Sequence, residues 1–457
     1  MSAASMPGDG AAELAIDTIA AVATPPGEGA IAMVRVSGPE ARRILGEVFQ
    51  PRHGAGPETP RRTCLGAVAD GAGVIDHGMA VWYRGPASYT GEDVVELTCH
   101  GGMLVVQRVL EALLRHGARL AEPGEFTQRA FLNGKIDLTQ AEAVMDLIRA
   151  QTDLALRAAN QQLSGNLGAE LLELQDALLT VLAHIEAYID FPDEAIDPDT
   201  TAELASQLEG VIQRVNPLLA SAEQGRVLRH GLRTVIYGPP NVGKSSLLNL
   251  LLGFERAIVS AVPGTTRDTI EEVINVRGVP VRLVDTAGAR PTGDEVEQAG
   301  IARTARELIN SDLVLWVVDG SQPKPAMPPP GQPHVLILNK SDLGLHRDWE
   351  AASGAIPFSC WDKTGVEPLK QSIFARFLQG GAGTDTFRIA ISVRHEGCLT
   401  RAKGALDEAL VSLREERSPE FTAIEIREAL EAIGEVVGKT DTEDLLGRIF
   451  SEFCIGK

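Results

Sequence analysis

From residue 238 the chain reads Gly238-Pro239-Pro240-Asn241-Val242-Gly243-Lys244-Ser245, directly after a β-type run at 234–237 and before a helical pattern at 246–252. This context is typical of a phosphate-binding loop, in which glycines let backbone amides approach phosphates at a helix N-terminus. Lys244 is expected to reach the β- and γ-phosphates, and the Ser245 hydroxyl to bind Mg²⁺. The sequence therefore predicts an α/β nucleotide-binding unit.

A second motif specifies the base. Asn339-Lys340-Ser341-Asp342 follows the apolar run at 335–338. A carboxylate at Asp342 can accept both donors on the Watson-Crick edge of guanine, and a site built for those hydrogen bonds rejects a base that leaves them unpaired. The expected ligands are therefore GTP and GDP.

Two further motifs lie between the first two. Asp285-Thr286-Ala287-Gly288 ends a strand-type run and supplies a carboxylate for the Mg²⁺ shell. The segment 264–268 contains Thr266, the hydroxyl expected to close on Mg²⁺. Four motifs in this order predict a GTP-hydrolysing switch protein. The expected GTP-binding residues in or directly after these motifs are Asn241, Val242, Gly243, Lys244, Ser245, Ser246, Gly264, Thr265, Thr266, Asp285, Thr286, Ala287, Gly288, Asn339, Lys340 and Asp342.

One position departs from the simplest GTPase pattern. Ras-like proteins carry after the Gly288 position a glutamine that orients the attacking water, and this chain has Ala289 there. Alanine cannot orient a water molecule, so another group must do so. Glu295 and Glu297 are the nearby candidates.

The regions around this unit have other periods. Short β-type runs at 31–36 and 94–97 and a helical stretch at 103–116 indicate a mixed α/β region from residue 16 to about 122. Beyond it the pattern is helical. Thr139 with Glu142, and Thr422 with Glu425, have the spacing of capping boxes. One apolar helix face is formed by Leu171, Leu174, Leu178, Val181, Leu182, Ile185 and Ile189.

Strand-type runs at 234–237, 281–284, 313–318 and 335–338 alternate with helical patterns, and helices resume at about residue 394. The nucleotide unit is therefore expected to be inserted into a helical domain. The predicted fold class is an N-terminal α+β domain, a helical-bundle domain and a Ras-like P-loop domain with a doubly wound, mostly parallel sheet.

Composition narrows the class of protein further. A formal charge of −20 disfavours non-specific nucleic-acid binding, which needs clustered Lys and Arg. The five scattered cysteines form no C-x-x-C pair and are expected to be free thiols. There is no signal-peptide pattern in the first residues and no apolar run of the roughly 20 residues that span a bilayer. We therefore expect a cytoplasmic protein with no membrane contact.

At several places the chain resembles the tRNA-modification GTPase MnmE (TrmE) family. Besides the nucleotide motifs, the similar segments are Thr24–Gly27, Val34–Gly38, Ser88–Asp93, His100–Gly102, Pro123–Lys135 and the terminal Cys454-Ile455-Gly456-Lys457. Together they extend over nearly the whole chain from Asp17 onward.

Residues 1–14, rich in Ala and Gly, are expected to form a loose tail. The resemblance implies a folate-binding and dimerisation domain at 15–122, a helical domain in two parts at 123–230 and 381–457, and a GTPase domain at 231–380. A tetrahydrofolate derivative carrying a one-carbon unit would contact Arg35, Glu96, Lys135 and Lys457. The implied activity is GTP hydrolysis coupled to addition of a (carboxymethyl)aminomethyl group to the wobble uridine of tRNA. The implied assembly is a homodimer, in a heterotetramer with a tRNA-modification protein that carries FAD.

The resemblance also addresses the missing glutamine. Glu297 aligns with the catalytic base or water-positioning residue. K⁺ would be bound by Asn241, Ser260, Val262 and Thr265, and would activate hydrolysis when the switch domains dimerise. The resemblance also implies GTP-binding roles for Ser260, Ala261, Val262, Pro263 and Ser359. Cys454 is implied to be a functional thiol, and a lipidation signal is disfavoured because Gly456 is not aliphatic.

Two rival functions are distinguishable by sequence. A ribosome-assembly GTPase binding rRNA shares the nucleotide motifs but usually carries a basic RNA-binding module, and none is evident. A scaffold that only binds nucleotide would not need Glu297 or the K⁺ ligands.

Overall fold

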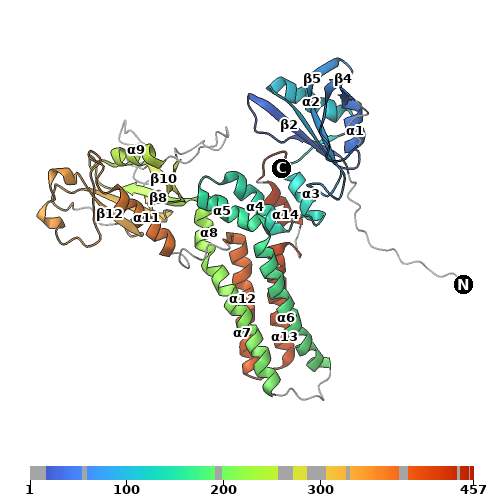
Figure 1. Cartoon of the computed structure of the whole chain (residues 1–457). Helices are drawn as coiled ribbons and strands as arrows, with labels where there is room; N and C mark the ends of the chain where they lie inside the picture. Colours follow the sequence, from blue (N-terminus) through green and yellow to red (C-terminus); the bar gives the residue numbers. More distant parts are fainter. Residues whose placement is uncertain are drawn as a thin grey trace. The chain divides into compact units, whose positions relative to one another are not determined.

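The computed structural model describes residues 17–53, 59–190, 198–255, 271–285, 305–325, 330–379, 390–439, 443–451 and 453–457. The chain divides into two compact units, Met1–Ala141 with Asp441–Lys457 and Glu142–Thr440 (Figure 1). The predicted fold class is confirmed: a β-rich N-terminal domain, a helical domain and a P-loop domain with a mostly parallel sheet are all present. Among the residues described, no helix combines the length and apolar character needed to cross a bilayer.

A seven-stranded sheet forms the first unit, in the order β3-β4-β5-β6-β2-β1-β7. Its neighbours pair antiparallel except β1 and β7, which are parallel. Apolar side chains of α1 and α2 pack with the sheet in one core. The element bounds are β1 Ile19–Val22, β2 Gly29–Ser37, α1 Ala41–Val48, β3 Phe49–Pro51, β4 Cys64–Asp70, β5 Gly73–Tyr83, β6 Val94–Gly101, α2 Met103–Arg115, β7 Arg119–Leu120, α3 Glu125–Leu132 and α14 Glu443–Ser451.

The C-terminal segment returns to this sheet. Ile455 forms a β-bridge with Pro123. Gly456 has φ +96°, and a Cβ there would lie 2.3 Å from the carbonyl oxygen of Val22, so only glycine fits this close approach. The terminal Lys457 is therefore placed at the end of β1, next to the strand that carries Arg35.

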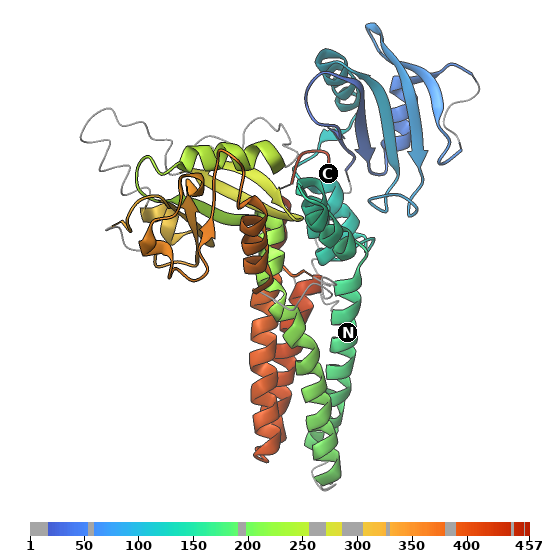
Figure 2. The same ribbon diagram turned by 60° about the vertical axis from the view of Figure 1, so that its left-hand side comes forward.

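Four long helices pack side by side in the second unit (Figures 1 and 2). They are α6 Asn166–Asp190, α7 Pro198–Ala220, α12 Val393–Arg414 and α13 Pro419–Val437; the shorter helices are α4 Leu138–Arg149, α5 Asp153–Leu163 and α8 Ala222–His230. The predicted apolar face of α6 is confirmed, since Leu171, Leu174 and Leu178 are fully buried in the core that the four helices share. Helices from both sides of the nucleotide unit thus share one core.

The nucleotide unit is built on a six-stranded sheet in the order β13-β12-β11-β8-β10-β9. All neighbouring pairs are parallel except β10 with β9. Helices α8, α9 and α11 share one apolar core with the sheet. The bounds are β8 Leu232–Tyr237, α9 Lys244–Glu255, β9 Glu271–Val276, β10 Val279–Asp285, β11 Leu313–Asp319, β12 His334–Asn339, η1 Ser341–Leu343, η2 Arg347–Trp349, β13 Ile356–Pro357 and α11 Val366–Gln379.

Both predicted capping boxes are wrong. At α4 the cap is Asp137, whose Oδ1 accepts the Gln140 N–H at 2.9 Å while Gln140 Oε1 accepts the Asp137 N–H at 3.0 Å. Thr422 lies inside α13, which begins earlier because Pro419 presets a helical φ at its first position. The capping box that the structure does contain at α12 uses Ser392 and His395.

Glu142 belongs instead to a buried charge cluster between α4 and α12. Its Oε1 accepts from Arg394 Nε at 2.6 Å, and its Oε2 lies 2.8 Å from Nε2 of the fully buried His395. Arg394 also donates to the carbonyls of Glu435 and Val436 at the end of α13. Because His395 Nδ1 accepts the Ser392 N–H, Nε2 carries the imidazole proton and faces the carboxylate.

Replacing Glu142 with Gln is expected to lower the free energy of unfolding by about 3 kcal/mol, since Arg394 would keep a buried charge without its carboxylate. Burial raises the pKa of Glu142, but His395, Arg394 and Arg229 outweigh it and hold that pKa far below 4.5. Burial lowers the pKa of His395 below 6.5. Both depressed pKa values mean that stability present above pH 6.5 is lost as the pH falls, first through His395 and below pH 4.5 through Glu142.

Urea unfolding followed by circular dichroism between about pH 8 and pH 3 measures the destabilisation of the variant and the loss of stability as the pH falls. The matched control is Glu186→Gln, because Glu186 pairs with Arg427 on the exposed surface of the same bundle and such pairs contribute little. Equal stability of the two variants would contradict the role given to the cluster.

Candidate functional site

The phosphate-binding loop lies between β8 and α9, as predicted. Gly238 has φ +154°, and a Cβ there would lie 2.0 Å from the Val317 carbonyl oxygen. Gly243 has φ +97°, and its Cβ would lie 2.2 Å from Asn339 Nδ2. Asn241 has φ +62°, a left-handed conformation that asparagine tolerates better than most residues. Backbone geometry therefore requires both glycines.

Lys244 and Ser245 are the first two residues of α9, directly after this loop. The Lys244 ammonium donates to the carbonyls of Gly238 at 2.8 Å and Pro239 at 2.7 Å, so it lies over the loop. Ser245 and Ser246 are exposed, whereas Val242 is buried. The positive end of α9 and an exposed hydroxyl fit the chemistry of a phosphate with a bound Mg²⁺.

The Asn-Lys-Ser-Asp motif contacts the loop through Asn339. This side chain is 3% exposed, and its Nδ2 donates to the Val242 carbonyl at 2.7 Å. Parallel pairing of β12 with β11, and of β11 with β8, brings these strand ends to one edge of the sheet. Asp342, three residues on, is exposed. The structure thus exposes the Asp342 carboxylate in a motif that contacts the phosphate loop through Asn339.

The loop after β13 completes this edge. Ser359 is fully buried, and its Oγ accepts the N–H of Trp361 at 3.2 Å and that of Asp362 at 3.4 Å. Burial raises the pKa of the neighbouring Cys360 thiol, with the nearby Asp342 carboxylate contributing and a hydrogen bond with Asn339 opposing it. The buried Ser359 hydroxyl therefore orders the loop itself.

The remaining predicted residues of the nucleotide site lie at the end of β10 or outside the described residues. Asp285 ends β10, whose register with β8 puts its backbone opposite Ile236, one residue before the end of that strand. Outside the described residues lie Ser260, Ala261, Val262, Pro263, Gly264, Thr265, Thr266, Thr286, Ala287, Gly288 and Glu297.

A second constellation lies on the sheet of the N-terminal unit. Arg35 and Glu96 are register partners on β2 and β6, and their side chains form an ion pair at 2.8 Å with 16% exposure each. The Arg35 guanidinium lies 5.3 Å from the ring centre of Tyr89 and 5.8 Å from that of Phe126. Sequence reasoning missed both rings, although each falls in a segment quoted above.

Two other predicted residues, Lys135 and Cys454, contact the segments that carry the two rings. Lys135 donates to the Pro86 carbonyl at 2.9 Å and so contacts the loop that carries Tyr89. Burial and the Glu96 carboxylate raise the pKa of Tyr83. Cys454 is exposed, and its carbonyl accepts the Gly124 N–H at 3.5 Å, next to the helix of Phe126. All five cysteines are free thiols.

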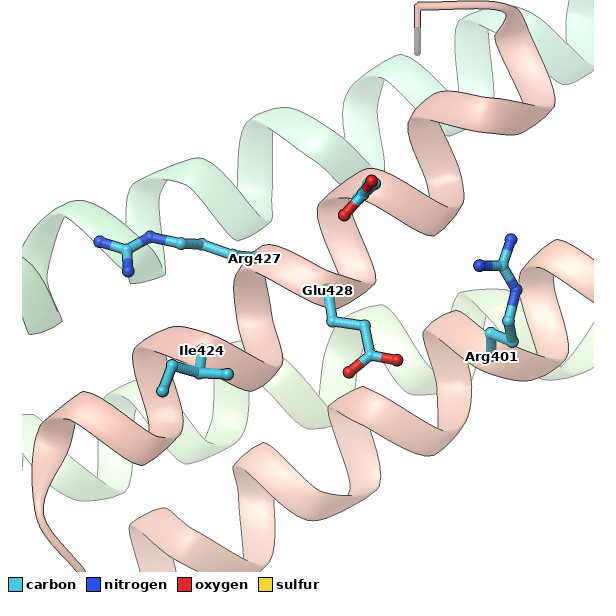
Figure 3. Close-up of a pocket in the computed structure, with 5 residues that line it drawn as sticks. Arg401, Ile424, Arg427 and Glu428 are labelled. Atoms are coloured by element: carbon cyan, nitrogen blue, oxygen red, sulfur yellow. The ribbon is translucent and has the colours of Figure 1, made fainter. Parts of the chain in front are cut away.

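A shallow hollow of about 420 Å³ lies elsewhere, between α12 and α13 (Figure 3). It is lined by Arg401, Ile424, Arg427, Glu428 and Glu431. Arg401 pairs with Glu435 and Arg427 with Glu186, so both cations are engaged within the bundle. We assign no ligand to it.

The mostly parallel sheet, the phosphate-binding loop with its two required glycines, and the contact of Asn339 with that loop define a P-loop protein of the GTPase class. Residues 18–135 match the family described as "GTP-binding protein TrmE N-terminus", and residues 138–454 match "MnmE helical domain". The "tRNA modification GTPase MnmE" of Akkermansia muciniphila is 53% identical over 446 residues, which cover 96% of this chain and 99% of that protein. The same-named protein of Heliobacterium modesticaldum is 46% identical, with coverage of 96% and 99%.

The chain therefore belongs to the tRNA modification GTPase MnmE family. It is a GTPase that acts in tRNA modification, which sets aside the ribosome-assembly alternative. Among solved structures, Era of Aquifex aeolicus is 21% identical with a TM-score of 0.26, covering 38% of this chain and 65% of that one. The G domain of FeoB of T. maritima is 25% identical with a TM-score of 0.22, covering 31% and 96%.

Proposed function

We propose that this GTPase adds a (carboxymethyl)aminomethyl group to the wobble uridine of certain tRNAs, together with a partner protein that carries FAD. The carbon would come from a one-carbon unit on tetrahydrofolate. The observation that carries this proposal is the Arg35–Glu96 pair between two aromatic rings. Family membership supports the GTPase activity and the tRNA substrate. We expect the protein and its tRNA substrate in the cytoplasm.

The residues of the N-terminal unit fit a folate. Both hydrogen bonds from Arg35 go to Glu96 Oε1, at 3.1 and 2.8 Å, so Arg35 fixes a carboxylate that is suited to the donor groups of a pterin. Tyr89 and Phe126 offer ring surface beside it. Lys135 and the terminal Lys457 are the cations suited to the glutamyl carboxylates. Bound there, folate would supply the one-carbon unit, and the exposed Cys454 is the thiol proposed to act beside it.

GTP hydrolysis is proposed to require Mg²⁺ and K⁺. Ser245 and Thr266 would bind Mg²⁺, and Asn241, Ser260, Val262 and Thr265 would bind K⁺, which supplies positive charge beside the phosphates. Of these, the structure describes Asn241 and Ser245, and both have exposed side chains at the phosphate loop. Glu297 would orient the attacking water or accept its proton.

A homodimer is proposed through the N-terminal unit and, during hydrolysis, through the switch domains. Ile31 and Met103 are each 68% exposed, as is Leu104, and Ile31 pairs in register with His100 just before Met103. Exposed apolar side chains grouped in this way favour a protein contact. Two such chains would join two FAD-dependent partner chains in the heterotetramer.

Replacing Arg35 with Met is expected to raise the Kd for tetrahydrofolate roughly 10- to 100-fold, because a charge-assisted contact is lost and Glu96 is left unpaired. Isothermal titration with tetrahydrofolate measures this. In a reconstituted reaction with the FAD protein, tRNA and a ¹³C-labelled one-carbon unit on the folate, mass spectrometry should find the label on the wobble uridine, and much less of it with the variant.

The matched control is Arg43→Met, since Arg43 pairs with Glu40 on the exposed surface of the same unit. It should bind folate normally. Unlabelled but modified uridine would overturn the folate donor, whereas an unchanged Kd in the Arg35 variant would overturn the location of the site.

A further inference from the structure

Asp319 is a carboxylate at the base-binding edge that no motif singled out. It ends β11, and its register partner in the neighbouring strand β12 is Asn339. Lys340 directly follows Asn339, the last residue of β12. Asp319 therefore lies at the same sheet edge as the phosphate loop and the Asn-Lys-Ser-Asp motif.

Each oxygen of the Asp319 carboxylate has a defined partner. Oδ2 accepts from Lys340 Nζ at 2.7 Å, while Oδ1 accepts the Ser321 N–H at 3.0 Å and the Ser321 hydroxyl at 2.6 Å. The side chain is 17% exposed. Partial burial raises the pKa of Asp319, but the hydrogen bonds from Lys340 and Ser321 outweigh it and keep the pKa below its usual value. The carboxylate thus stays charged and is oriented toward the ammonium.

The backbone of Lys340 is fixed as well. It has φ +63°, in the left-handed region, and its carbonyl accepts the Leu343 N–H at 3.0 Å as η1 begins. With Cα and Nζ both held, the four-carbon stem follows one path while the side chain remains 37% exposed. A lysine held in this way has lost its rotamer freedom before a ligand arrives.

We propose that Asp319 is a positioning residue for nucleotide binding, which holds the Lys340 ammonium so that the lysine stem presents a fixed apolar surface to the purine ring. The inference rests on the proposed binding of guanine at Asp342. Because the stem is ordered in advance, binding does not have to order it. The contact is made with the ring face, so Asp319 contributes affinity for any purine that fits, whereas Asp342 distinguishes guanine.

The test compares GDP with inosine diphosphate, whose base lacks the 2-amino group. Asp319→Asn is expected to raise the Kd for both nucleotides by the same factor, roughly 3- to 10-fold. In a Lys340→Met background the same change is expected to have no further effect, because two residues that act through one contact are not additive. Asp319→Glu, which keeps the charge, should recover part of the affinity.

Two controls keep the outcomes separate. Asp348→Asn changes another acidic residue of the same domain, with 40% side-chain exposure, and should leave both Kd values unchanged. Asp342→Asn should weaken GDP more than inosine diphosphate; equal weakening would overturn the placement of guanine. The Asp319 inference is overturned if Asp319→Asn leaves both Kd values unchanged, or if its effect adds in full to that of Lys340→Met.

Discussion

A Gly238→Ala variant is expected to bind GDP more than about 100-fold less tightly than the native chain, a loss of about 2.7 kcal/mol. Alanine strongly disfavours the φ of +154°, and its Cβ would lie 2.0 Å from the carbonyl oxygen of Val317. That oxygen belongs to the backbone of the buried strand β11, so the loop rather than the strand must move. A displaced loop no longer aims its amides at the phosphates.

The control for Gly238 is Gly253 in α9. A Cβ at Gly253 meets no atom within 4 Å, so alanine there is expected to stabilise the helix by about 0.5–1 kcal/mol. Fluorescence titration with a labelled GDP and thermal unfolding distinguish the two variants. Native affinity in Gly238→Ala would show that the close approach to β11 does not determine the loop's shape.

Glu297→Ala is expected to lower kcat for GTP about 100-fold or more, the usual contribution of a group that handles the proton of attacking water. The Kd for GDP should stay the same, since the residue is proposed to act on water and not on the nucleotide. Glu295→Ala is the matched control, two residues away with the same charge removed. Equal losses in both variants would remove Glu297 from its proposed role.

The same assay in K⁺ and in Na⁺ tests the cation site. We expect the native chain to hydrolyse GTP at least tenfold faster in K⁺, since charge placed beside the phosphates stabilises the transition state. Asn241→Ala should abolish the difference between the two salts. Equal turnover of the native chain in both salts would contradict the proposed K⁺ ligands.

Sequence alone was sufficient where the determinants are local. The β8 strand, the loop and α9 lie within 24 residues of each other, from Leu232 to Glu255, and their apolar period and glycines carry the prediction. The apolar face of α6 was likewise readable from its spacing. Helix starts were not, because Asp137 and Pro419 compete with Thr139 and Thr422 for the same role and pattern alone does not rank them.

Tertiary structure was needed wherever residues distant in sequence act together. The resemblance named Arg35 and Glu96, but only the strand register pairs them, and only the packing of α3 brings Phe126 to the guanidinium. The spacing in the sequence predicts Glu142 to be part of a helix cap. In the structure it pairs instead with Arg394, which lies 252 positions away in the sequence.

The amino-acid sequence alone thus determined that a P-loop unit selective for guanine interrupts a helical domain. It could do so because the strand, the glycine loop and the Asn-Lys-Ser-Asp motif are each a short, continuous stretch of residues. Which charges meet was decided only by the fold. Nothing in the sequence links Asp319 with Lys340. They form an ion pair because the parallel strands β11 and β12 end at the same edge of the sheet.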